Sequence, residues 1–108
     1  VATPSNPTGT VLPREQLSSL CQFIESKQGA LIVDEIYQGL VYDTENYTAL
    51  EVSEDCFVIN SFSKYFGMTG WRIGWMVVPE AYVEAIDRIA QNIFLATTTM
   101  SQYAALVA

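Results

Sequence analysis

The stretch CFVINSFSKYFGMTGWRIGWMVVP, residues 56–79, contains two short apolar runs joined by a polar loop with several glycines. The runs, 56–62 and 73–79, lack the polar–apolar alternation of a half-exposed strand, which is typical of strands covered on both faces of a sheet. A third run of this kind, ALIVDE at 30–35, lies upstream and ends in two carboxylates. The sequence therefore predicts three buried strands.

Helical patterns lie on both sides of these strands. Residues 13–29 begin with a proline, place apolar side chains on one face and end at a glycine, which predicts a helix. Residues 80–96 have the same amphipathic spacing, and residues 97–108 are expected to begin another helix. The polar stretch 37–55 is expected to be an extended loop. Strands mixed with helices predict an α/β fold with three layers, α/β/α, and a mostly parallel sheet.

Composition excludes several classes of function. The 108 residues are enough for one domain, and a formal net charge of -7 argues against a surface for nucleic acid or an anionic membrane. No apolar run approaches the length of a membrane span. The chain has no His, so Ser-His and Cys-His triads and most zinc sites are excluded, and no metal site is expected. Cys21 and Cys56 are expected to be free thiols in a reducing, cytoplasmic compartment.

Polar residues gather where the predicted strands end. Asp34 closes the first strand, and Ser61, Ser63 and Lys64 follow the end of the second. Asn6, in a proline- and glycine-rich turn near the start of the chain, could be brought to the same edge. In open α/β sheets, ligands bind beyond the carboxyl ends of the strands. We therefore expect these side chains to line one site.

Lys64 has two interpretations. A lysine that follows a strand is commonly a solvated surface charge. Here its neighbours Phe62, Tyr65 and Phe66 surround the amine with aromatic side chains. Desolvation favours the neutral form of an amine, which is a nucleophile toward aldehydes.

Arg72, Asp34 and Tyr37 also allow alternatives. Arg72 is either one half of a surface ion pair or an anion clamp, and nearby serines and glycines favour a clamp for phosphate. Asp34 could cap a helix or pair with an arginine, but it could also hold a proton on a ring nitrogen. Tyr37, taken by itself, is more typical of a packing residue than of a residue with a chemical role. A phosphate clamp, a nucleophilic lysine and a carboxylate together match what a protein supplies to pyridoxal 5′-phosphate (PLP).

Three segments resemble successive signatures of the class I/II aminotransferases, the aspartate-aminotransferase-like PLP enzymes of fold type I. They are SNPTG (5–9), VDEIYQGLVYD (33–43) and SFSKYFGMTGWRIGW (61–75). The third is the most specific, because Ser-x-Ser-Lys is followed eight residues after the lysine by an arginine within Gly-x-Arg-x-Gly. The resemblance implies an α/β PLP-binding domain and assigns a role to each candidate residue.

By this resemblance, Lys64 would form the Schiff base with PLP and move the proton between the substrate Cα and the cofactor. Asp34 would pair with the pyridinium nitrogen. Asn6 and Tyr37 would hydrogen-bond the phenolic oxygen. The phosphate would be bound by Ser61, Ser63 and Arg72.

The resemblance also implies a larger parent protein, because chains of this family are several times longer. Residues 1–108 are expected to be a fragment of the large PLP-binding domain, without the N-terminal part and the small C-terminal domain, and to be inactive alone. The parent would be a homo-oligomeric enzyme of amino acid metabolism, which exchanges an amino group between an amino acid and a 2-oxo acid. The fragment could also associate by exchanging elements. Alternatives on the same scaffold are a PLP-dependent C–S lyase or related enzyme and the PLP-binding domain of a transcriptional regulator.

Overall fold

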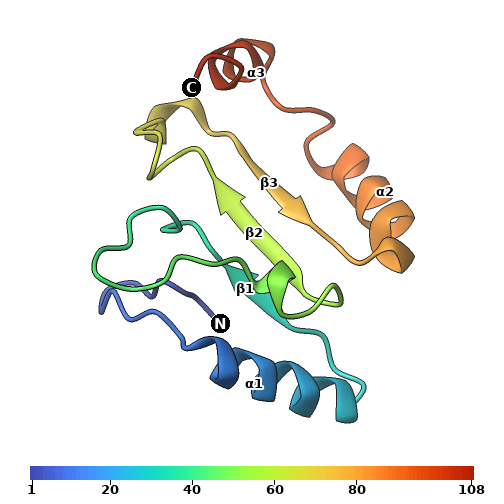
Figure 1. Ribbon diagram of the computed structural model, residues 1–108. Coiled ribbons are helices and arrows are strands. Elements are labelled where there is room, and N and C mark those ends of the chain that lie inside the picture. The colour runs from blue at the N-terminus through green and yellow to red at the C-terminus, as the bar shows by residue number, and fades with distance from the viewer.

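The computed structural model describes all residues from Val1 to Ala108 (Figure 1). Three helices and three strands follow one another along the chain, with three short 3-10 turns between them. The helices and strands are α1 (Arg14–Ser26), β1 (Ile32–Asp34), β2 (Phe57–Ser61), β3 (Gly74–Val77), α2 (Val83–Ile93) and α3 (Thr99–Ala105).

All six elements lie within the ranges predicted for them. The helix expected over 13–29 begins one residue later, because Pro13 has the extended backbone of a helix cap. The helix expected over 80–96 is divided into a 3-10 turn, Glu80–Tyr82, and α2. The polar segment 37–55 is a loop except for the 3-10 turn Ala49–Glu51. The α/β class is thus confirmed.

The sheet has the order β1-β2-β3 and is mixed. β1 and β2 are parallel, with Asp34 opposite Ile59, whereas β2 and β3 are antiparallel, with Ser61 opposite Gly74. Within these three strands, β3 is thus an antiparallel addition to the parallel pair that the sequence predicted. The loop between β2 and β3 contains no α-helix, which a crossover to a parallel strand ordinarily requires, so the chain turns back beside β2.

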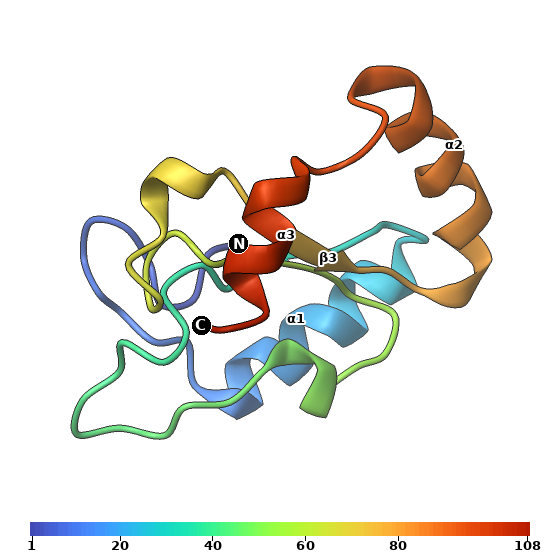
Figure 2. The same cartoon turned by 90° about the horizontal axis from the view of Figure 1, so that it is seen from above.

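The helices α1 and α2 lie on opposite sides of the sheet, as the view from above shows (Figure 2). The side of α1 is well packed, with a core of five buried residues: Leu17, Val33, Ala49, Cys56 and Val58. Helix α2 has no buried residue, and Ile32, Ile59 and Met76 are exposed on the strands. The three layers are therefore present, but only the α1 layer is closely packed against the sheet.

None of the helices is both long enough and apolar enough to cross a membrane.

Candidate functional site

The carboxyl ends of β1 and β2 place Asp34 and Ser61 on one face of the sheet. Asp34 is opposite Ile59 in the parallel register, and Ser61 lies two residues further along β2. Side chains two residues apart on a strand share a face, so both polar groups project from the same side. Oδ1 of Asp34 accepts a hydrogen bond from the amide of Ile36 at 3.0 Å. Oδ2 has no donor in the chain, so it is available to a ligand.

The segment that leads into the turn with Asn6 lies beside β1, although 31 sequence positions separate Asn6 from Tyr37. The amide of Thr3 donates to the carbonyl of Asp34 at 3.0 Å, and the amide of Asp34 donates to the carbonyl of Val1 at 2.8 Å. Asn6 and Tyr37 consequently line one cavity of about 200 Å³. The structure thus brings these two predicted residues together.

Lys64 lies over the ring of Tyr37, with its Nζ 5.6 Å from the ring centroid. The side chain is half-buried and forms no ion pair, although the chain has 12 carboxylates and only five basic side chains. Arg14 and Arg88 are paired with glutamates. An unpaired, half-buried cation in an acidic chain suits an anionic or carbonyl-containing ligand.

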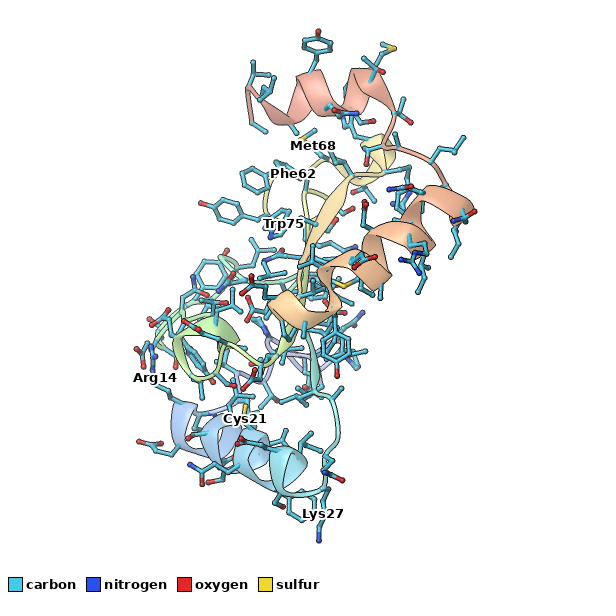
Figure 3. All side chains as sticks on the ribbon, turned by 90° about the vertical axis from the view of Figure 1, so that its right-hand side faces the viewer. Arg14, Cys21, Lys27, Phe62, Met68 and Trp75 are labelled. Carbon is cyan, nitrogen blue, oxygen red and sulfur yellow. The ribbon has the colours of Figure 1, made fainter.

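An aromatic cluster supports the loop around Lys64. The ring of Phe62 lies 4.8 Å from that of Phe66 and 5.2 Å from that of Trp75 on β3, between ring centroids. Tyr65 meets Phe66 edge-on at 5.1 Å. Figure 3 shows Phe62 and Trp75 near the same end of the sheet, with Met68 close to Phe62. Phe62 is therefore packed against β3, and Phe66 and Tyr65 are joined to it through ring contacts.

Ser61 and Ser63 form a network of short hydrogen bonds. Their hydroxyl oxygens are 2.9 Å apart, and the amide of Ser63 donates to Oγ of Ser61 at 3.0 Å. Oγ of Ser61 also lies 3.1 Å from the carbonyl oxygen of Ile73, to which it can donate. A hydroxyl carries one hydrogen. When Ser61 donates to Ser63, the hydroxyl hydrogen of Ser63 is free to donate to another acceptor.

Arg72 directly precedes Ile73 and has a left-handed backbone, with φ 53° and ψ 50°. This conformation is costly for a residue with a Cβ, and such strain is concentrated at functional sites. The guanidinium donates to the carbonyl of Thr69 at 3.1 Å and forms no ion pair. It makes no hydrogen bond to Ser61 or Ser63, but the bond from Ser61 to Ile73 joins the two segments.

Glu35 is a buried carboxylate that the sequence analysis did not single out. Its Oε1 accepts hydrogen bonds from the amide of Ala49 at 2.6 Å and from the hydroxyl of Thr48 at 3.1 Å. Burial raises the pKa of Glu35, and the two hydrogen bonds oppose this effect. Successive side chains of a strand point to opposite faces, so Asp34 and Glu35 must face opposite sides of the sheet. This period of two could have predicted that one of the two carboxylates is buried in the core.

The residues present fit PLP. They supply an unpaired amine, a carboxylate oxygen without a donor, and hydroxyl and guanidinium donors for a phosphate, at one edge of the sheet. Aromatic groups flank the amine, and the strained backbone of Arg72 lies next to the serine network. No group of His, Cys, Asp or Glu in the chain could hold a metal ion.

Comparisons with known proteins identify the family. The profile of the family described as aminotransferase class I and II matches residues 1–108. The chain belongs to this family. It is 44% identical over 110 residues to valine–pyruvate aminotransferase of Mycobacterium tuberculosis, which covers 100% of this chain and 28% of that protein. It is 43% identical over 111 residues to (5-formylfuran-3-yl)methyl phosphate transaminase of Methanocaldococcus jannaschii, with 29% of that protein covered.

The fold of this class I and II aminotransferase chain is found in solved structures. It superposes on an aminotransferase from Mycobacterium tuberculosis with a TM-score of 0.93 and 43% sequence identity, covering 97% of this chain and 29% of that one. The chain thus spans less than a third of the length of these family members. Both related enzymes are named for transamination, but the names refer to different substrates.

Proposed function

We propose that this chain is part of a PLP-dependent aminotransferase that transfers an amino group between an amino acid and a 2-oxo acid, in the cytoplasm. Residues 1–108 would belong to its PLP-binding domain. One observation carries the proposal: the unpaired, half-buried amine of Lys64 lies over Tyr37 and follows the hydrogen-bonded pair Ser61 and Ser63. Family membership supports the same conclusion.

PLP, when bound, supplies an electron sink that stabilises negative charge at the substrate Cα. Lys64 is proposed as the Schiff-base lysine, and its amine would afterwards take a proton from the substrate Cα and return it. Asp34 would keep a proton on the ring nitrogen through Oδ2. Asn6 and Tyr37, which line one cavity, would hydrogen-bond the phenolic oxygen.

The phosphate is proposed to bind Ser61, Ser63 and Arg72. A guanidinium can donate two parallel hydrogen bonds to a phosphate, and such charge-assisted bonds are about twice as strong as neutral ones. The hydroxyl hydrogen of Ser63 would point to the same anion. The apolar surface of Phe62 and Phe66 would exclude water from the neighbouring amine.

Binding of the substrate α-carboxylate is assigned to residues outside this chain. Arg14 pairs with Glu45 and Glu51, and Arg88 pairs with Glu84, so neither guanidinium is free for a substrate. We therefore propose that residues 1–108 alone do not catalyse transamination. The same reasoning leaves the choice between transamination and a lyase reaction to the substrate pocket, because both use these cofactor contacts.

Self-association is part of the proposal. Ile32, Ile59 and Met76 expose apolar side chains on one face of the sheet, and Ile89 and Ile93 are exposed on α2. Apolar surface of this kind is commonly covered by further parts of a chain or by a second copy. Light scattering after size-exclusion chromatography would test this, and a monomer at high concentration would contradict it.

The deciding experiment traps the bond between cofactor and protein. The full-length protein is incubated with PLP, reduced with borohydride and digested with trypsin, and the peptides are mapped by mass. We expect a pyridoxyl group on Lys64 alone, and none in Lys64→Ala. Lys27, an exposed lysine at the end of α1, is the internal control for non-specific labelling. Equal labelling of Lys27 and Lys64 in the wild type, with total labelling of Lys64→Ala reduced only by the lost lysine, would reject the assignment of Lys64.

The reaction itself needs a separate readout. The wild-type enzyme is incubated with PLP, is not reduced, and is mixed with amino acids of different classes, and the release of the matching 2-oxo acid is followed. We expect 2-oxo acid to form together with the amine form of the cofactor. Release of a thiol or of ammonia instead would favour the lyase alternative while leaving the role of Lys64 intact.

A further inference from the structure

Cys21 and Cys56 meet in the fold although 35 positions separate them in the sequence. Their sulfur atoms are 3.6 Å apart, in van der Waals contact, and both thiols are free. Cys21 lies in the middle of α1, and Cys56 is the residue before β2. Figure 3 shows Cys21 on the side of α1 that faces the sheet, whereas Lys27 at the end of the helix points away.

Both cysteines line a cavity of about 360 Å³, which lies on the α1 side of the molecule. The wall includes the end of α1 and the segment before β2, and none of the proposed cofactor residues contributes to it. Two carboxylates, Glu25 and Asp55, also line this cavity. A small neutral reagent can therefore approach the half-buried Cys21, whereas negative charge at the wall disfavours an anionic one.

We propose that Cys21 and Cys56 form a redox-active dithiol, which a peroxide oxidises to a disulfide that joins α1 to the start of β2. Closure requires the sulfurs to approach by about 1.5 Å, to the S–S distance of about 2.05 Å. The approach would involve the half-buried side chain of Cys21 and the irregular loop before Cys56.

The two thiols have different parts in the reaction. Burial raises the pKa of Cys56 to about 11, so this thiol is a poor nucleophile at neutral pH. Cys21, which is more exposed, is therefore the thiol that attacks the peroxide. Its sulfur forms a bond to one oxygen, the O–O bond breaks, and water leaves, which yields a sulfenic acid on Cys21.

Cys56 then resolves this sulfenic acid. Its sulfur attacks the sulfur of Cys21, the S–S bond forms and the S–O bond breaks, and the thiol proton of Cys56 leaves with the hydroxyl group as water. In sum, two thiols and one hydrogen peroxide give one disulfide and two waters. The protein is oxidised by two electrons and the peroxide is reduced by two. A dithiol reductant reverses the change.

Peptide mapping of the full-length protein tests the proposal. Trypsin cleavage after Arg14, Lys27 and Lys64 places Cys21 in the peptide 15–27 and Cys56 in the peptide 28–64. After treatment with hydrogen peroxide and alkylation of the remaining thiols, we expect these two peptides joined, with a mass two hydrogens below their sum. The joined species should disappear on reduction with dithiothreitol.

Variants and a denatured control separate a preorganised pair from random oxidation. Cys21→Ser and Cys56→Ser should each abolish the joined peptides, and Cys56→Ala replaces the second variant if serine is not tolerated at the buried position. In guanidinium, the joined peptides should form at least tenfold more slowly than in the folded protein. The proposal is overturned if Cys56 stays fully alkylatable after peroxide treatment of the folded protein, or if unfolding does not slow the reaction.

Discussion

Gly39 lies directly against the ring of Tyr65, so that a Cβ on residue 39 would come within 2.5 Å of Cδ2 of that ring. Gly39 also has a left-handed backbone, with φ +88°. The contact joins the loop that follows Asp34 and Tyr37 to the loop that follows Lys64. The ring of Tyr65, the residue after Lys64, therefore occupies space that a side chain at residue 39 would need.

Gly39→Ala is expected to destabilise the protein more than a matched substitution elsewhere. Left-handed backbone costs an alanine about 1–2 kcal/mol, and the Cβ would in addition force the ring of Tyr65 to move. Gly9 is the control, because its φ is +70° and a Cβ there would meet no atom within 4 Å. Denaturant unfolding of Gly9→Ala and Gly39→Ala measures the difference, and equal losses would show that Tyr65 moves at no cost.

Arg72→Gly is expected to separate backbone strain from anion binding. Glycine adopts the left-handed region of residue 72 without penalty but is more flexible when unfolded, so the free energy of unfolding should change by less than about 1 kcal/mol. Affinity for PLP should fall at least tenfold, because the guanidinium is lost. Fluorescence titration with PLP measures the affinity, and Arg72→Lys, which keeps the charge, should be intermediate. An unchanged affinity in Arg72→Gly would remove Arg72 from the phosphate site.

Glu35 is expected to make the stability of the protein decrease as the pH rises from acid. Burial raises the pKa of Glu35 above its ordinary value of 4.5, so its favourable contribution is fully present below this value and is lost as the pH rises through the raised pKa. Glu35→Gln keeps an oxygen acceptor for Ala49 and Thr48 without the charge. Relative to this variant, the wild type should lose stability as the pH increases, as measured by denaturant unfolding between pH 4 and 8.

Glu35→Ala should behave differently from Glu35→Gln. The alanine leaves the buried amide of Ala49 and the hydroxyl of Thr48 without an acceptor, which costs about 1–3 kcal/mol at any pH. If both variants were equally stable at neutral pH, Glu35 would not anchor the 3-10 turn Ala49–Glu51.

Arg14 is expected to contribute stability with the opposite pH dependence. Its guanidinium binds Glu45 at 2.7 Å and Glu51 at 2.9 Å and lies 4.6 Å from the ring centroid of Tyr47. The hydrogen bond from Arg14 lowers the pKa of Glu51, so this contribution is present above the ordinary value of 4.5 and is lost as the pH falls through the lowered pKa.

Arg14→Gln should therefore be less stable than the wild type at pH 7 and nearly equal to it at pH 2. Because these groups are exposed, the difference at pH 7 should be small and should shrink further in 1 M salt. Arg88→Gln, which breaks an exposed pair with Glu84 within α2, serves as the control. A deficit of Arg14→Gln that persists unchanged at pH 2 would point to lost packing on Tyr47 instead of charge.

Local sequence was sufficient for the position and type of every helix and strand. The apolar runs that became β1, β2 and β3, and the amphipathic spacing of α1 and α2, are short-range patterns set by the periods of strand and helix. The order of Asp34, Ser61, Ser63, Lys64 and Arg72 along the chain was also enough to suggest a cofactor site. The roles of these residues remain predictions.

Tertiary structure decided the relationships between segments far apart in the chain. The antiparallel direction of β3, the contact of Cys21 with Cys56, the hydrogen bonds of Glu35 to Thr48 and Ala49, and the packing of Gly39 under Tyr65 have no local signature. Each depends on how the helices, strands and loops pack against one another. It is therefore decided by packing and hydrogen bonds between residues that are distant in the sequence.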